Sequence, residues 1–143
     1  MSYKKRVDTL RVIMSGSPYI QNSSRRNAII GEVNRINGVS RAAKSNGWLL
    51  AVLHTTRALD TALAEIVDAK GWKTTKTVSL GGYIVALASN GILSPFERNE
   101  YQNDLVNKRN KYMHEAGAMP NQVEANAILG KMHACIVAVL ARI

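Results

Sequence analysis

The chain has 143 residues, 46% of them hydrophobic and 20% charged, and a formal net charge of +9. This length suits a single domain, residues 1–143, that can bury its own core without disulfides or bound metals. Cys135 is the only cysteine, which excludes a disulfide framework and a thiolate metal cluster and suggests a buried small side chain. Without a signal-peptide pattern or an evident membrane-spanning run, we expect a cytoplasmic protein with no membrane partner.

The positive charge is concentrated in residues 1–46, which carry nine Lys and Arg against two acidic residues, a net charge of +7. The remaining residues carry ten against eight, a net charge of +2. This asymmetry indicates an anionic partner, and we expect RNA. The side chains predicted to bind it in this segment are Lys4, Lys5, Arg6, Arg25, Arg26, Arg35 and Arg41. A solvated basic face, or a DNA-binding helix-turn-helix within residues 22–45, is the alternative.

Apolar periodicity predicts the first four helices in chain order. They cover residues 3–14, 22–45, 48–69 and 78–90, each with apolar side chains recurring at helical spacing. A β-strand is the competing interpretation of residues 83–87, but an isolated strand would have no partner. The sequence therefore favours helices throughout this part of the chain.

A strong helix start follows at Ser94. Serine at the N-cap, Pro95 at the first helical position and Glu97 three residues after the cap form a capping box, and this helix should end near Gly117. A last helix is expected from about residue 120 to the C-terminus. The fold class predicted from these elements is all-α, an up-and-down helical bundle with an extra basic N-terminal helical segment.

Three polar side chains near the end of the Ser94 helix could act on a phosphodiester. Asn110 and His114 are four residues apart and so share a helix face, while Arg109 lies about 100° from Asn110. A guanidinium can grip a phosphate and an imidazole can move a proton near neutral pH. Cleavage of RNA by its own 2′-hydroxyl needs these two functions and no metal.

The pattern Arg-Asn-x-x-x-His followed by Glu resembles the HEPN family, and the resemblance covers residues 47–143 as a HEPN-like core. It implies a helical bundle with the motif in the penultimate core helix, and a homodimer whose two motifs face each other. Family members with this spacing are typically metal-independent endoribonucleases that leave 2′,3′-cyclic phosphate and 5′-hydroxyl ends. The resemblance also implies a role as a toxin, in abortive infection or in RNA processing, with a possible antitoxin or regulatory partner.

The resemblance assigns roles to the motif residues. His114 would be the general base or acid, Arg109 would neutralise the phosphate, and Asn110 would orient the histidine or the scissile group. Glu115 and Tyr112 are candidates to support these groups, and Lys111 is a candidate to bind RNA. We expect no metal and no cofactor, because zinc, EF-hand, P-loop and dinucleotide-binding patterns are all missing from the sequence.

A purely structural use of the same residues is the alternative. Arg109 would then pair with Asp60, Glu65 or Glu124, and His114 would cap its helix. His54 is expected to be a structural histidine, and Arg57 to pair with an acidic neighbour. In that case the chain would be a dimeric nucleic-acid-binding or adaptor protein without catalysis.

Overall fold

Helices account for the regular secondary structure of the described part of this computed structural model, which is residues 2–20, 22–41, 47–75 and 77–143. The elements are α1 (Tyr3–Gly16), α2 (Ser23–Arg41), α3 (Gly47–Ala69), α4 (Leu80–Ser89), α5 (Pro95–Tyr101), the π-helical segment η1 (Gln102–Val106), α6 (Asn107–His114) and α7 (Gln122–Arg142). The all-α prediction is confirmed, and residues 83–87 lie in α4 and not in a strand. The predicted end of the second helix, at residues 42–45, lies outside the described residues.

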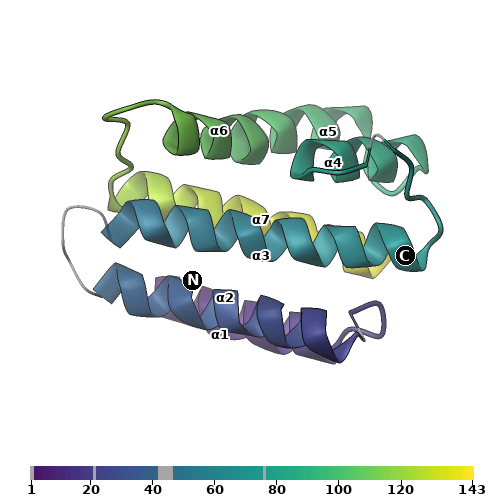
Figure 1. Ribbon diagram of the computed structural model, residues 1–143, viewed down its shortest axis with the longest axis horizontal. Helices are drawn as coiled ribbons and strands as arrows, with labels where there is room; N and C mark the ends of the chain where they lie inside the picture. Colours follow the sequence, from purple (N-terminus) through teal and green to yellow (C-terminus); the bar gives the residue numbers. More distant parts are fainter. Residues whose placement is uncertain (1, 21, 42–46, 76) are drawn as a thin grey trace.

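The helices form three layers around α3 (Figure 1). The first layer is α1 and α2, the second is α3 and α7, and the third contains α4, α5 and α6. α3 packs against α2, α4, α6 and α7. Because the rod from α5 to α6 runs opposite in direction to α3, the end of α6 lies over the N-terminal half of α3.

The buried side chains form one continuous cluster that includes the basic N-terminal segment. Val7 and Leu10 of α1 are fully buried in the same cluster as Leu59 of α3 and Ile136 of α7. The described part of residues 1–46 thus contributes an apolar side to the core, while Lys4 and Lys5 remain exposed. Cys135 is also fully buried, and burial raises the pKa of its thiol to about 12, as expected for a core side chain.

The rod from α5 to α6 begins as predicted and departs from a regular α-helix in its middle. The Ser94 capping box is present, and α6 ends at His114, with Gly117 in the left-handed region at φ 82°. The π-helical segment η1 was not predicted. A π-helical turn holds more residues than an α-turn, so η1 changes the direction in which the side chains of α6 point.

One helix in the described part of the chain, α7, is long and apolar enough to cross a membrane by length and composition, whereas no run of that length was expected from the sequence. Core helices of soluble proteins pass the same test. Leu129, Met132 and Ile136 of α7 are fully buried within the bundle. These contacts account for its apolar character through packing.

The capping box of α5 gives a pH-dependent prediction. Arg142 donates to the Glu97 carboxylate over 2.7 Å and the Ser94 N–H donates over 3.0 Å, which together lower the pKa of Glu97 from 4.5 to about 2. A lowered folded-state pKa stabilises the fold above pH 4.5, and this contribution disappears as the pH falls toward 2. We expect Glu97→Gln to reduce the free energy of unfolding by about 1 kcal/mol at pH 7. In urea denaturation, the difference in unfolding free energy between Glu97→Gln and the wild type should shrink toward pH 2.5. A difference that does not change with pH would contradict the lowered pKa of Glu97.

Candidate active site on the face of α2, α3 and α6

The motif side chains lie on α6, and Arg109 lies at the side of this helix that meets α3. The Arg109 side chain is 20% exposed, whereas Asn110 and His114 are open to solvent. Arg109 Nη2 donates to Asn110 Oδ1 over 3.4 Å, so these two residues are in contact. The structure therefore gives α6 a partly buried guanidinium next to an exposed amide and an exposed imidazole.

Arg109 also pairs with Asp60 of α3. Its Nη1 lies 3.5 Å from Asp60 Oδ2, and its buried Nε has no hydrogen-bond partner among the described residues. Burial raises the pKa of the Asp60 carboxyl, and the nearby guanidinium opposes that shift. The guanidinium is thus held at the α3–α6 contact by a long ion pair. This is the pairing with Asp60 that a purely structural use of Arg109 predicts.

The His114 side chain, unlike that of Arg109, is not engaged by another described residue. His114 is the last residue of α6, and the described part of the chain offers its side chain no hydrogen bond or ion pair. The helix end is instead closed by the backbone N–H of Glu115, which donates to the Lys111 carbonyl oxygen. Helix capping by the His114 side chain, the other half of the structural alternative, is therefore not observed.

Tyr112 supports α6 from the opposite side. Its ring is buried, and its hydroxyl donates to the Glu124 carboxylate of α7, a residue that also caps α7. Burial, followed by this carboxylate, raises the pKa of Tyr112 to about 12, so the phenol stays protonated. Glu115 and Lys111 are exposed, with the Lys111 ammonium 5.7 Å from the Tyr112 ring centre. Tyr112 thus positions the motif helix and takes no part in the open face.

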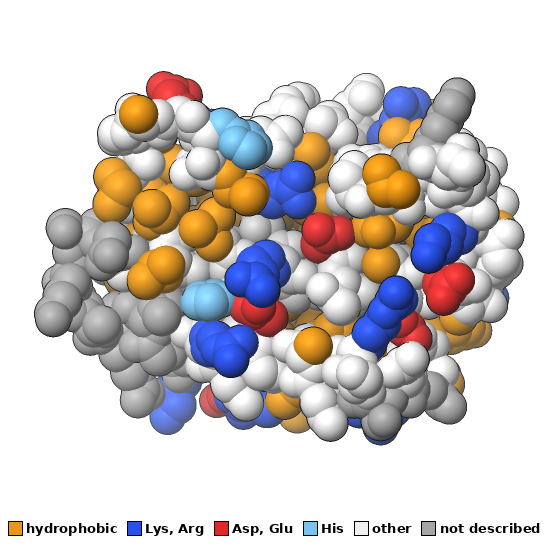
Figure 2. All heavy atoms as spheres, viewed as in Figure 1, with side chains coloured by type: hydrophobic (Ala, Val, Ile, Leu, Met, Phe, Trp, Pro, Cys, Tyr) orange, Lys and Arg blue, Asp and Glu red, His pale blue; other side chains and the backbone are white. Residues whose placement is uncertain are grey.

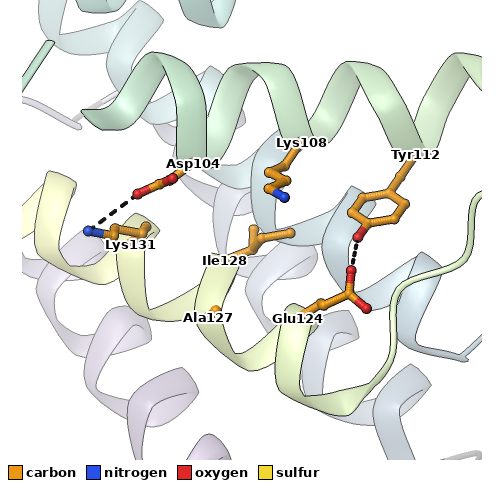
Figure 3. A pocket seen from close by; sticks show the side chains of 7 residues that line it. All are labelled: Asp104, Lys108, Tyr112, Glu124, Ala127, Ile128 and Lys131. Atoms are coloured by element: carbon orange, nitrogen blue, oxygen red, sulfur yellow. Dashed lines mark hydrogen bonds and ion pairs between the residues drawn. The ribbon is translucent and has the colours of Figure 1, made fainter. Parts of the chain in front are cut away.

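A pocket of about 220 Å³ lies between the η1–α6 segment and α7 (Figure 3). Lys108 points into it, and Lys131 on the opposite wall pairs with Asp104 over 3.4 Å. Tyr112 is the one motif-helix residue of the predicted set on its wall. Because neither Arg109 nor His114 lines this pocket, it is separate from the predicted chemistry.

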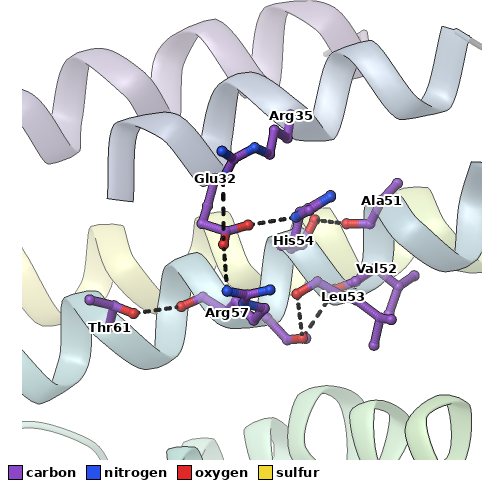
Figure 4. A network of polar contacts seen from close by, with 10 residues as sticks. Glu32, Arg35, Ala51, Val52, Leu53, His54, Arg57 and Thr61 are labelled. Carbon is purple, nitrogen blue, oxygen red and sulfur yellow. Dashed lines mark hydrogen bonds and ion pairs between the residues drawn. The ribbon is translucent and has the colours of Figure 1, made fainter. Parts of the chain in front are cut away.

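A second polar cluster lies between α2 and α3 (Figure 4). Glu32 is only 7% exposed, and its carboxylate meets His54 Nδ1 at 2.5 Å, Arg57 at 3.1 Å and Arg35 at 3.9 Å. The predicted acidic partner for Arg57 is confirmed. Sequence reasoning missed the cluster itself, although Glu32/Arg35 and His54/Arg57 each have the three-residue spacing of one helix face.

The Glu32 cluster and the motif side chains of α6 belong to one face of the molecule. His54, Arg57 and Asp60 follow one another at three-residue intervals on α3, with Glu32 on one side and Arg109 on the other. Figure 2 shows histidine and Lys or Arg side chains gathered across this face, beside hydrophobic side chains over the N-terminal half of α3 and the end of α6. We call this the α2–α3–α6 face.

Several of the predicted RNA-binding arginines are engaged within the fold. Arg25 pairs with Glu65 of α3 over 2.7 Å, and Arg26 Nε donates to the Ile20 carbonyl oxygen over 2.9 Å. Arg35 contacts Glu32 but remains 62% exposed. These contacts give the basic segment a role in helix packing in addition to any role in binding.

The other N-terminal cations differ in their exposure. Lys4 and Lys5 are exposed, whereas Arg6 is half-buried against α7 at Gly130, with its Nε buried and without a partner among the described residues. The side chain of Arg41 lies outside the described residues. Lys4 and Lys5 are therefore the N-terminal cations of this group best placed to meet an anion.

Comparison with known proteins gives no family assignment. The chain matches no protein-family model, and no curated protein or solved structure is significantly similar to it. The chemistry of the α2–α3–α6 face and the motif on α6 must therefore support any functional proposal.

Replacing Asp60 tests whether Arg109 is available to a phosphate. We expect Asp60→Asn to strengthen binding of a 2′-deoxy oligonucleotide about 3-fold, because it removes the anion that competes for Arg109. Stability should change by less than about 1 kcal/mol, since the ion pair is long, at 3.5 Å, and both side chains keep some contact with solvent. Fluorescence anisotropy and urea denaturation measure the two effects. Unchanged affinity together with a large loss of stability would show that the pair is purely structural.

Proposed function

We propose that this protein is a metal-independent endoribonuclease of the HEPN type. The observation that carries the proposal is the exposed His114, which has no hydrogen-bond or ion-pair partner among the described residues, on the same short helix as Arg109, at an open face of the bundle. The all-α architecture and the position of the motif in the helix before the last one agree with the resemblance of the sequence. HEPN membership itself is part of the proposal.

The chemistry assigned to this face is attack of a ribose 2′-oxygen on the adjacent phosphorus. The 2′-oxygen forms a bond to phosphorus as the bond from phosphorus to the 5′-oxygen breaks, which gives a 2′,3′-cyclic phosphate and a 5′-hydroxyl. His114 transfers a proton, and Arg109 stabilises the charge that grows on the phosphoryl oxygens. Asn110, in contact with Arg109, orients the phosphate or the guanidinium.

RNA capture and dimer formation use different parts of the surface in this proposal. Lys4, Lys5 and Lys111 are exposed and can neutralise phosphates whatever the base sequence. Exposed apolar side chains accompany the motif, with Met113 52% and Leu50 37% exposed. A second copy of the chain covering these side chains would form the homodimer and leave the polar part of the face open to RNA.

A non-catalytic RNA-binding protein is the second candidate. The ion pair between Arg109 and Asp60 favours it, because a guanidinium held by a carboxylate in the fold already has a structural use. In that case the exposed cations would bind RNA and the His114 imidazole would transfer no proton.

Cleavage of total RNA in EDTA separates the two candidates. We expect the purified protein to cut RNA equally well in an excess of EDTA and in Mg²⁺. In the proposed mechanism, side chains both bind the phosphate and transfer the proton. Sequencing of the fragments should find 2′,3′-cyclic phosphate and 5′-hydroxyl ends. RNA binding without cleavage would support the second candidate, and 5′-phosphate ends would contradict the mechanism.

A further inference from the structure

We propose that Arg35 and Arg57 form a binding site for a backbone phosphate of single-stranded RNA, on the line along which α2 and α3 pack. We call this line the α2–α3 seam; Glu32 and Arg35 reach it from α2, and Arg57 from α3. The inference rests on the proposed function for the nature of the ligand. It deepens that function by stating where a part of the strand outside the scissile phosphate is held.

The ion pairs of the seam keep the anion inside and the cations outside. The Glu32 side chain is 10% exposed, whereas the side chains of Arg57 and Arg35 are 70% and 62% exposed. The surface pair between Arg11 and Asp8 on α1 has no such order, because its carboxylate is at least as exposed as its guanidinium. A polyanion that approaches the seam therefore meets the guanidinium groups before it meets the carboxylate.

The seam also carries more positive than negative charge at Glu32. Arg57 Nη2 lies 3.1 Å and Arg35 Nη1 lies 3.9 Å from the same carboxylate oxygen, Oε1, and Figure 4 shows the carboxylate between the two arginines. One carboxylate cannot neutralise two guanidinium groups, so one positive charge has no counterpart in this contact. Each guanidinium has five N–H donors, and those that Glu32 does not use can donate to a phosphate.

Glu32 prepares the two arginines for binding. A long side chain that is already held in the free protein loses less rotamer freedom when it binds a ligand. His54 Nδ1 contacts the other Glu32 oxygen, Oε2, at 2.5 Å, which fixes the carboxylate independently of the arginines. The role of Glu32 is thus to position Arg35 and Arg57, and their outer N–H groups make the contact with the phosphate.

The two ends of the seam differ in charge. Arg25 pairs with Glu65 further along the same helices, but the exposed carboxylate of Asp68 also acts on Arg25. Two carboxylates then face one guanidinium, whereas two guanidinium groups share one carboxylate at Glu32. The end with Arg35 and Arg57 is therefore the one suited to an anion.

This end of the seam lies beside the motif without being part of it. Arg57 is three residues before Asp60, which is about 60° around the axis of α3 and about 4.5 Å along it, and Asp60 pairs with Arg109. Figure 2 shows Lys or Arg side chains following one another across α6, α3 and α2 on this face. A strand whose scissile phosphate meets Arg109 can thus place another of its phosphates on Arg57 and Arg35.

The test measures binding of a 2′-O-methyl RNA oligonucleotide, which lacks the nucleophile and is not cut. Arg35→Gln/Arg57→Gln removes both charges, and Glu32 keeps His54 as its partner. Arg35→Lys/Arg57→Lys keeps the charges and serves as the rescue variant. Lys73→Gln/Arg98→Gln is the matched control, because it removes two exposed charges from the α3–α4 loop and α5, away from the seam.

At about 50 mM salt, we expect the double Gln variant to bind about 10-fold more weakly than the wild type. The slope of log affinity against log salt concentration should fall by about 1.4, which is about 0.7 for each lost phosphate contact with a single strand. The double Lys variant should keep the wild-type slope and bind within about 3-fold of the wild type. Fluorescence anisotropy measures the binding, and urea denaturation shows whether each variant is folded.

Three results would overturn the inference. One is wild-type affinity and slope in the double Gln variant. Another is an equal loss in the Lys73→Gln/Arg98→Gln control, which would show that net charge alone attracts RNA. The third is binding of the wild type to vesicles of anionic phospholipid and not to RNA, which would assign the seam to a membrane surface.

NMR gives a readout that a purely structural role would not produce. The Nε–H resonances of Arg35 and Arg57 should shift when the oligonucleotide is added, and unchanged resonances at RNA saturation would overturn the inference. Cleavage is measured separately. If the wild type binds RNA through the seam and cuts none, the inference stands and the proposed endoribonuclease fails. If the wild type cuts RNA in EDTA and the double Gln variant binds as tightly, the inference fails and the proposed function stands.

Discussion

His114→Ala and Arg109→Ala should each lower the rate of RNA cleavage in EDTA at least about 100-fold. In the proposed mechanism the imidazole transfers a proton during the reaction, and the guanidinium meets charge that grows only in the transition state. Single-turnover cleavage at saturating RNA measures both losses without interference from binding. His133→Ala serves as the control, because His133 lies on α7 and outside the α2–α3–α6 face.

Arg109 needs a further control because it pairs with Asp60. Arg109→Lys can keep an ion pair with Asp60, but it lacks the fork of N–H donors that grips a phosphate. We therefore expect Arg109→Lys to be folded and nearly as slow as Arg109→Ala. Full activity in Arg109→Lys or in His114→Ala, in protein free of contaminating nuclease, would contradict the roles assigned to them.

Glu32→Gln should lower the free energy of unfolding by about 2 kcal/mol at pH 7. Glu32 is 7% exposed and is the common partner of His54, Arg57 and Arg35. A neutral amide of the same shape keeps the packing and removes the charge that these three side chains share. The loss is limited because Arg57 can turn into solvent. Urea denaturation measures it.

Asp8→Asn is the matched control for Glu32→Gln. Asp8 pairs with Arg11 on the surface of α1, where its side chain is 46% exposed. This change should cost less than about 0.5 kcal/mol, because exposed ion pairs contribute little. Equal effects of Glu32→Gln and Asp8→Asn would show that the Glu32 cluster is no more than a surface ion pair.

The helices could be predicted from the sequence because their signals are local. Ser94, Pro95 and Glu97 fix a helix start within four residues, and Gly71, Gly91 and Gly117, all with positive φ, follow helix ends. The π-helical segment Gln102–Val106 could not be predicted, because no residue in it marks a change in helix type. Tyr101, just before the segment, and Leu105, within it, are both buried in the core.

The candidate site was predictable only in part. The spacing of Arg109, Asn110 and His114 located the motif on one helix, and Asp60 was among the three carboxylates considered for Arg109. The contact between Glu32 and His54 joins residues 22 positions apart in sequence. Such a contact depends on how α2 packs against α3, and helical periodicity alone does not set the pairing of side chains across two helices.

The exposure of individual cations also depended on tertiary structure. Lys5 and Arg6 are adjacent in sequence, yet Lys5 points to solvent and Arg6 lies against Gly130 of α7. A count of positive charges in residues 1–46 therefore overstates the number available to an anionic partner. The helix face on which each residue falls decides whether its charge binds a partner or packs within the bundle.

Cleavage of DNA oligonucleotides of mixed sequence, each containing one ribonucleotide, tests the central claim most directly. In EDTA, the wild type should cut only after the ribonucleotide and leave a 2′,3′-cyclic phosphate and a 5′-hydroxyl, and His114→Ala should leave the strands intact. An all-DNA strand should not be cut. Cleavage at deoxyribonucleotides, a requirement for a metal ion, or equal cleavage by His114→Ala would contradict the account.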